Sequence, residues 1–98
     1  MNVSINAVSF KADKKLEEFI SKKVDKLSKS YEAVLGSEVT LKVDNSVEPE
    51  NKIAEIRLTI RGNELFAKKQ CKSFEEAADT AVEAIRKQLV KHKEKLRD

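Results

Sequence analysis

Few residues in this chain could support catalysis or hold a metal ion, and none stands in a pattern that predicts an active site. His92 is the only histidine and Cys71 the only cysteine, which excludes an intrachain disulfide and a zinc site of the usual Cys/His kind. A Cys-His or Ser-His-acid pair would have to recruit His92 from a strongly basic segment, where it falls near an apolar stripe and is better interpreted as a packed or edge-lying side chain. Gly36 and Gly62 are the only glycines, so there is no glycine-rich phosphate loop. We therefore predict that the protein is not an enzyme and uses no metal, cofactor or small-molecule substrate.

Regularly spaced lysines point instead to a binding surface. Spacings of seven, four and three residues return to nearly the same side of an α-helix. Four lysines follow these spacings: Lys15, Lys22, Lys26 and Lys29. They predict a lysine ridge along one helix, although a soluble helix with a charged outer face would show the same pattern.

The last quarter of the chain divides into an acidic and a basic half. Residues 73–85 carry four acids and no base: Glu75, Glu76, Asp79 and Glu83. From residue 86 onward only Glu94 and Asp98 oppose six basic residues: Arg86, Lys87, Lys91, Lys93, Lys95 and Arg97. Such an order complements a helix macrodipole, but that effect is confined to the end turns and does not account for bases over three turns.

Two basic helices on one face of a sheet would present parallel ridges suited to RNA phosphates, because folded RNA is bound largely through shape, phosphates and 2′-hydroxyls. The chain has no Trp and its aromatic residues fall mostly on apolar stripes, so base stacking is poorly represented. Phe66 is the exception, and we interpret it as a partly covered surface residue rather than a stacking platform. The overall charge of +3 is too small to argue for RNA by itself.

The elements that would position these residues follow from hydrophobic periodicity. Alternating apolar residues predict strands over residues 3–7, 39–43, 54–61 and from 65 towards Cys71. Asp13 can cap a helix whose apolar stripe runs to about Tyr31, and Ser73 with Glu76 forms a capping box for a second helix that runs almost to the C-terminus. Gly36 is expected to release the chain after the first helix.

Turn-forming residues fill 44–51, and a tight turn is expected at Gly62-Asn63. The order β-α-β-β-β-α predicts an α+β fold in two layers, with a four-stranded, mostly antiparallel sheet and both helices on one face.

Length and composition agree with a single domain over residues 1–98. The hydrophobic fraction of 40% is enough for a thin two-layer core, while 38% charged residues predict an ionic exterior. No apolar run is long enough to span a membrane and no leader is visible, so we expect a soluble cytoplasmic protein.

The second half of the chain resembles the ribosome hibernation-promoting factor and ribosome-associated inhibitor family. The most specific segment is Lys-Gln-Leu-Val-Lys-His-Lys-Glu-Lys-Leu at 87–96, preceded by Ser-Phe-Glu-Glu-Ala-Ala-Asp at 73–79. Residues 16–20, 23–27 and 64–67 also resemble the family in order and spacing, so the likeness covers essentially the whole chain. Lys69 departs from it, because the family often has a small residue there.

The resemblance implies that the chain binds the small ribosomal subunit and its ribosomal RNA in the mRNA/tRNA channel, inhibiting translation sterically in resting or stressed cells. The chain resembles the short form, which lacks the C-terminal domain that pairs ribosomes, and we expect a monomer off the ribosome. From the charge pattern and the resemblance together, we predict these RNA-binding residues: Lys22, Lys23, Lys26, Lys29, Arg86, Lys87, Lys91, Lys93 and Lys95.

Three alternatives stay open at this stage. A general double-stranded RNA-binding protein has a similar architecture, although its usual order is α-β-β-β-α. A protein-interaction module could use the acidic segment from Glu75 to Glu83 to dock a basic partner. A small hydrolase or acyl-transfer enzyme lacks a nucleophile-base pair in this sequence.

Overall fold

The computed structural model describes residues 2–8, 10–30, 34–44 and 49–97, with side chains at 2, 28, 30 and 92–97 not described. Six elements follow one another in the predicted order β-α-β-β-β-α. They are β1 (Asn2–Ala7), α1 (Lys14–Ser30), β2 (Val34–Val43), β3 (Lys52–Ile60), β4 (Asn63–Cys71) and α2 (Phe74–Arg97).

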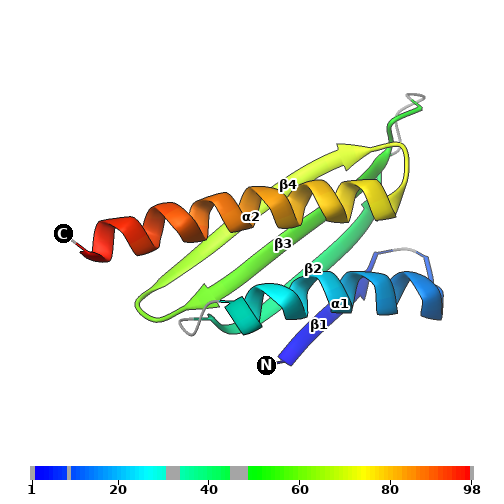
Figure 1. The fold of residues 1–98 in the computed structure, drawn as a ribbon. Helices are drawn as coiled ribbons and strands as arrows, with labels where there is room; N and C mark the ends of the chain where they lie inside the picture. The colour runs from blue at the N-terminus through cyan, green and yellow to red at the C-terminus, as the bar shows by residue number, and fades with distance from the viewer. Residues whose placement is uncertain (1, 9, 31–33, 45–48, 98) are drawn as a thin grey trace.

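The four strands form one sheet in the order β1-β2-β3-β4. β1 pairs parallel to β2, while β2 with β3 and β3 with β4 are antiparallel. α1 is the crossover that brings the chain from β1 to the start of its parallel neighbour. Figure 1 shows both helices side by side on one face of the sheet, running in the same direction. The predicted α+β architecture with a mostly antiparallel sheet is confirmed.

The core lies between the helix layer and the sheet. Alternate residues of β3 face the helices and are buried, as the period-2 pattern predicts: Ala54, Ile56, Leu58 and Ile60. Ile20 and Val24 of α1 and Ile85 of α2 are fully buried in the same core. α2 lies over β3 and β4, and α1 packs beside α2 and contacts β1 and β2.

Both helices begin at the predicted caps. Asp13 Oδ1 accepts a hydrogen bond from the Leu16 backbone N–H at 2.7 Å, and Ser73 Oγ accepts one from the Glu76 N–H at 3.1 Å. Each cap satisfies a donor that the first helical turn leaves unpaired. In the described part of the chain, neither helix is long and apolar enough to cross a membrane.

The start of the second strand differs from the sequence prediction. β2 begins at Val34, and Gly36 lies inside the strand instead of releasing the chain before it. The reason is tertiary: Gly36 pairs with Asn2 on one side and Thr59 on the other, with a register shift between Val34 and Gly36. Tyr31, the predicted end of the first helical stripe, lies outside the described residues.

The β3–β4 hairpin is also displaced by one residue from the prediction. Its two loop residues are Arg61 and Gly62, because Ile60 pairs with Asn63. Gly62 has φ of 74°, a left-handed conformation that glycine adopts without steric cost. Asn63 opens β4, where its Oδ1 accepts the Glu64 N–H at 2.8 Å. The predicted turn over 44–51 lies partly outside the described residues, and the Asp44 N–H donates to the Asn51 carbonyl at 2.8 Å across it.

Candidate nucleic-acid interface

The lysine ridge on α1 is a solvent-exposed surface. The four ridge residues are all exposed: Lys15, Lys22, Lys26 and Lys29. Lys29 pairs with Asp25 one turn earlier, at 3.2 Å between Nζ and Oδ2. Lys22 and Lys26 form no ion pair within the described residues, so their charges face solvent.

Lys23 points away from that ridge and towards α2. Its Nζ lies 2.7 Å from Asp79 Oδ1 and 5.2 Å from the centroid of the Phe19 ring. Its side chain is 33% exposed, the least of the ion-paired cations on the helices. The structure therefore gives Lys23 a role in joining the two helices, which the one-dimensional pattern could not distinguish from the ridge.

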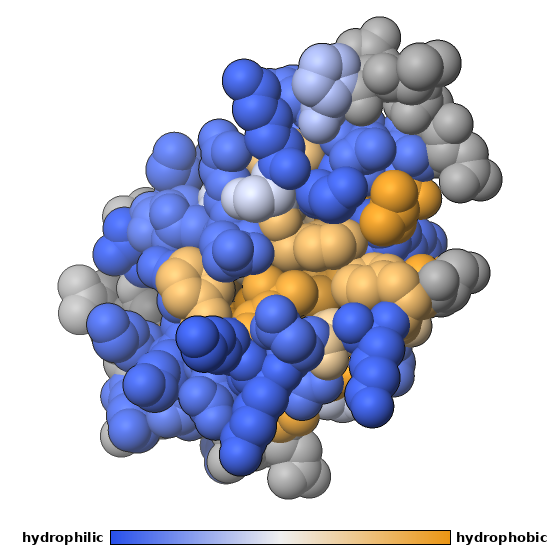
Figure 2. Space-filling model, turned by 90° about the vertical axis from the view of Figure 1, so that its right-hand side faces the viewer, coloured by the Kyte–Doolittle hydropathy of each residue, from blue (hydrophilic) through white to orange (hydrophobic). Residues whose placement is uncertain are grey.

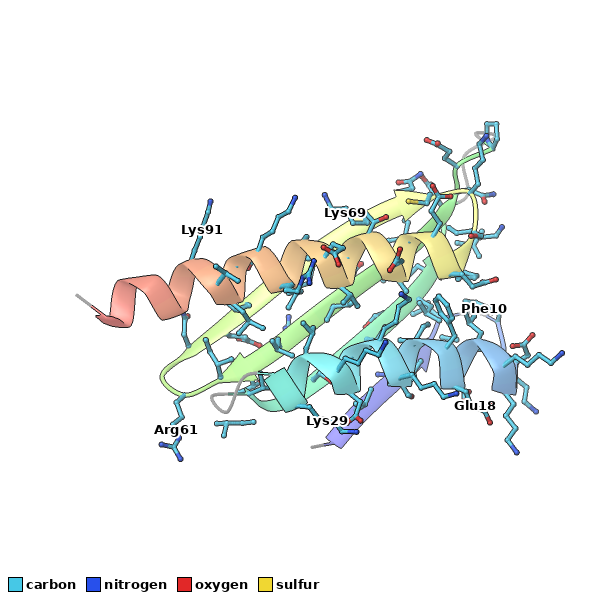
Figure 3. The ribbon with its side chains drawn as sticks, in the orientation of Figure 1. Phe10, Glu18, Lys29, Arg61, Lys69 and Lys91 are labelled. Atoms are coloured by element: carbon cyan, nitrogen blue, oxygen red, sulfur yellow. The ribbon has the colours of Figure 1, made fainter. Side chains whose placement is uncertain are left out.

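On α2 the predicted basic residues differ in their partners. Arg86 Nη2 lies 2.6 Å from Glu83 Oε2. Lys87 and Lys91 are exposed and form no ion pair with any described residue. In Figure 3, Lys91 extends from α2 on the side away from α1, the same side as Lys69 of β4.

The side chains of Lys93 and Lys95 lie outside the described residues, so their RNA-binding role stays a prediction. Their backbone belongs to the last turns of α2, which project past the end of the sheet in Figure 1.

A groove between the helices brings several of the predicted residues together. It is a hollow of about 360 Å³ lined by Lys23, Lys26, Leu27, Asp79, Val82, Glu83 and Arg86. Three of its cations belong to the predicted site, and two carboxylates of the acidic half of α2 lie among them. The acidic segment is therefore partly engaged with cations of its own chain, which weakens the case for it as a dock for a basic partner.

The opposite face of the sheet has a different electrostatic character. Lys42 Nζ pairs with Glu55 Oε2 at 2.9 Å, and Arg57 Nε pairs with Glu64 Oε1 at 3.0 Å. Phe66 lies on this face, 47% exposed, as strand alternation predicts. The mixed charges here do not form a basic surface.

A second hollow, of about 540 Å³, lies where both helices begin. Its lining includes four apolar residues that are half-buried: Phe10, Leu16, Phe19 and Phe74. The rings of Phe10 and Phe74 stack at 4.9 Å between centroids. Figure 2 shows this apolar region surrounded by hydrophilic side chains. Most aromatic residues fall on apolar stripes of the sequence, and Phe10 lies between the predicted elements, so hydrophobic periodicity does not indicate this hollow.

The described residues differ from the arrangements that bind metal ions. No group of three His, Cys, Asp or Glu side chains within them could hold a metal ion, and Cys71 is a half-buried free thiol. What the described arrangement offers is positive charge on two helices, suited to binding phosphates.

Comparison with known proteins decides the family. The model of the family described as "Sigma 54 modulation protein / S30EA ribosomal protein" matches residues 3–97. The chain belongs to this family. Its members are ribosome-associated modulation proteins, which confirms the family predicted from the sequence and agrees with a role in ribosome binding and translation regulation.

Solved structures agree with the family at the level of the fold. A ribosomal subunit interface protein from Coxiella burnetii matches with a TM-score of 0.82 and 15% identity, over 95% of this chain and 98% of that one. The N-terminal domain of Protein Y from Thermus thermophilus matches with a TM-score of 0.77 and 19% identity, over 90% and 94%. No curated protein matches the chain.

Within the family fold, the two segments that carry the resemblance most specifically belong to one helix. Residues 73–79 form its cap and acidic first turns, and residues 87–96 form its basic half. The family likeness and the charge reversal along α2 are therefore features of the same element.

Proposed function

We propose that this protein binds the small ribosomal subunit in the mRNA/tRNA channel and inhibits translation by steric occlusion in resting or stressed cells. The observation that carries the proposal is that four lysines of the predicted site are exposed on the two helices and pair with no described carboxylate: Lys22 and Lys26 on α1, Lys87 and Lys91 on α2. Membership of a ribosome-associated family supports the ribosome as the source of the RNA.

In this proposal, some cations of the two helices contact RNA phosphates, and others hold the helices in place. Unpaired lysines are ready to meet ribosomal RNA phosphates because they have no internal partner to leave. Lys29 and Arg86 must share or exchange a carboxylate before they contact RNA. Lys23 holds α1 against α2 and supports the surface from within. Lys93 and Lys95 extend the contact surface along the last turns of α2.

Inhibition in this proposal needs no chemistry. A folded domain in the channel would exclude messenger and transfer RNA by volume, and its affinity would come from neutralised phosphates together with shape. We propose that the protein acts in the cytoplasm and is monomeric away from the ribosome.

Co-sedimentation with purified small subunits and vacant ribosomes, run beside an in vitro translation assay, tests the proposal. We expect stoichiometric binding to small subunits and a matching loss of translation. Binding without inhibition would contradict occlusion of the channel, and absence of binding at low salt would remove the ribosome as the partner.

Competition with a plain RNA duplex at the same salt tests the general double-stranded RNA-binding alternative. We expect small subunits to compete far better than the duplex. Equal affinities would favour the general alternative over the ribosomal one.

A further inference from the structure

Two carboxylates of α2 lie in the groove between the helices, among cations of both helices. Asp79 and Glu83 are one helical turn apart on α2, and both line the groove between the helices. They lie among three cations of the same groove, Lys23, Lys26 and Arg86. A surface used only to attract phosphates would have no need of negative charge at this point.

Each carboxylate holds a cation. Asp79 pairs with Lys23 across the helices at 2.7 Å, and Glu83 pairs with Arg86 on the same helix at 2.6 Å. The Asp79 and Glu83 side chains are 55% and 49% exposed, so solvent screens both pairs and a phosphate could displace either cation at small cost. The carboxylate would stay behind, however, and would repel the phosphate that replaced it.

Unpaired lysines lie on both helices: Lys26 lines the groove itself, while Lys91 extends from α2 on the side away from α1 (Figure 3). Lys22 and Lys26 lie on α1, and Lys87 and Lys91 lie on α2. The helices run side by side in the same direction (Figure 1). The surface therefore carries unpaired lysines on each helix, with two carboxylate–cation pairs in the groove between the helices.

Such a surface distinguishes RNA by the path of its backbone. A continuous strand that crosses from one helix to the other brings its phosphates over Asp79 and Glu83. Two separate strands, one along each helix, meet only the unpaired lysines. A plain duplex laid across the helices offers the first arrangement, whereas folded RNA with strands on two sides of a cleft offers the second.

We propose that Asp79 and Glu83 are specificity-determining residues, which disfavour a continuous phosphate backbone across the groove and so favour folded RNA that presents one strand to each helix. This inference rests on the proposed binding of ribosomal RNA. In this inference, the two carboxylates repel an RNA backbone that crosses the groove and leave RNA strands that follow each helix unaffected.

The double variant Asp79→Asn with Glu83→Gln tests the inference. Affinity is measured by fluorescence anisotropy for a 20-base-pair RNA duplex and by co-sedimentation for small subunits, at the same salt. Removing two like-charge contacts at short range should raise duplex affinity by about ten-fold. Subunit affinity should rise less than about three-fold, so the preference for subunits falls.

A matched control separates position from net charge. Glu38→Gln with Glu64→Gln removes the same two charges from exposed residues on the open face of the sheet. It should change duplex affinity by less than about two-fold, because charges a Debye length away are largely screened. Circular dichroism checks that both variants are folded.

Two outcomes would overturn the inference. An equal rise in duplex and subunit affinity would show that the carboxylates only reduce overall attraction, and a duplex affinity no higher than that of the control would show that no backbone crosses the groove. Failure of the proposed function would look different, because the unmodified protein would then not sediment with subunits at all.

Discussion

The outer side of the helix layer and the open face of the sheet are both rich in charge, yet they arrange it differently. On the sheet, Lys42 and Arg57 each pair with a carboxylate of a neighbouring strand. On the helices, Lys22, Lys26, Lys87 and others face solvent without an ion pair among the described residues. The comparison teaches that a modest net charge of +3 can conceal a basic surface when one face neutralises itself.

The two geometries explain part of this difference. Neighbouring strands bring side chains of one face to within about 5 Å, which pairs acids with bases from distant parts of the chain. On the outward side of a helix, the neighbours of a side chain are residues of the same helix three and four positions away, and on the ridge of α1 several of these are further lysines, such as Lys22, Lys26 and Lys29. Repetition of one charge along a helix therefore persists as exposed charge.

The largest expected effect concerns what the two faces share, the core between them. Ile85→Ala removes a fully buried side chain of α2 that packs against the sheet. We expect the free energy of unfolding to fall by about 2–4 kcal/mol, from lost transfer energy and a residual cavity. Urea denaturation followed by circular dichroism measures it.

Val90→Ala on the same helix is the control for that experiment, because Val90 is 41% exposed. Its cost should stay within about 0.5 kcal/mol. Similar values for the two variants would mean that α2 does not stabilise the sheet in the way its burial indicates.

Matched neutralisation of the two faces should give the next largest effect. The helix variant carries Lys22→Gln, Lys87→Gln and Lys91→Gln, and the sheet variant carries Lys42→Gln, Arg57→Gln and Lys68→Gln. At about 1 kcal/mol for each lost phosphate contact, the helix variant should bind small subunits roughly 100-fold more weakly. The sheet variant, with the same net charge, should lose less than about three-fold. Equal losses of affinity in the two variants would show that RNA binding does not depend on the helix lysines more than on the sheet cations.

The salt dependence of binding should also differ between the helix variant and the sheet variant, by a smaller amount. Counterion release predicts that the slope of log affinity against log salt becomes shallower by about 0.7–0.9 for each phosphate contact removed. The helix variant should therefore lose about two units of slope and the sheet variant none. A helix variant with an unchanged slope would indicate that its lysines act through folding and not through phosphates.

The smallest expected effect is an increase in the free energy of unfolding, opposite in sign to the effect of Ile85→Ala. Ser37 is buried on the helix-facing side of β2, and its hydroxyl has no hydrogen-bond partner among the described residues. Ser37→Ala should raise the free energy of unfolding by up to about 1 kcal/mol, because it removes a desolvated polar group without adding volume. Thermal unfolding would measure this, and a destabilised variant would show that the hydroxyl is bonded in solution.

The sequence predicted the order of the elements because local signals determine them. The Asp13 and Ser73 caps, the alternation along β3 and the apolar stripe of α2 are all properties of short segments. The start of β2 could not be read in this way, because Gly36 is held in the strand by partners on β1 and β3.

The candidate site was predictable in outline and not in detail. Spacing alone placed the α1 lysines in one sector, and the structure shows all four exposed. Lys23 was grouped with them through the family resemblance, but its pairing with Asp79 depends on how the helices pack. The apolar hollow that includes Phe10 and Phe74 likewise depends on the meeting of segments far apart in the chain.

One further consequence follows from the outer edge of β4. Unpaired strand edges invite pairing with another chain and so promote aggregation. Here the side-chain amide of Gln88 donates to the Phe66 carbonyl at 2.9 Å and occupies one acceptor of that edge, while Lys68 and Lys69 are exposed beside it. A second copy that approached in register would bring its own lysines against these, so the strand is a poor template for fibril growth even where the protein accumulates to high concentration.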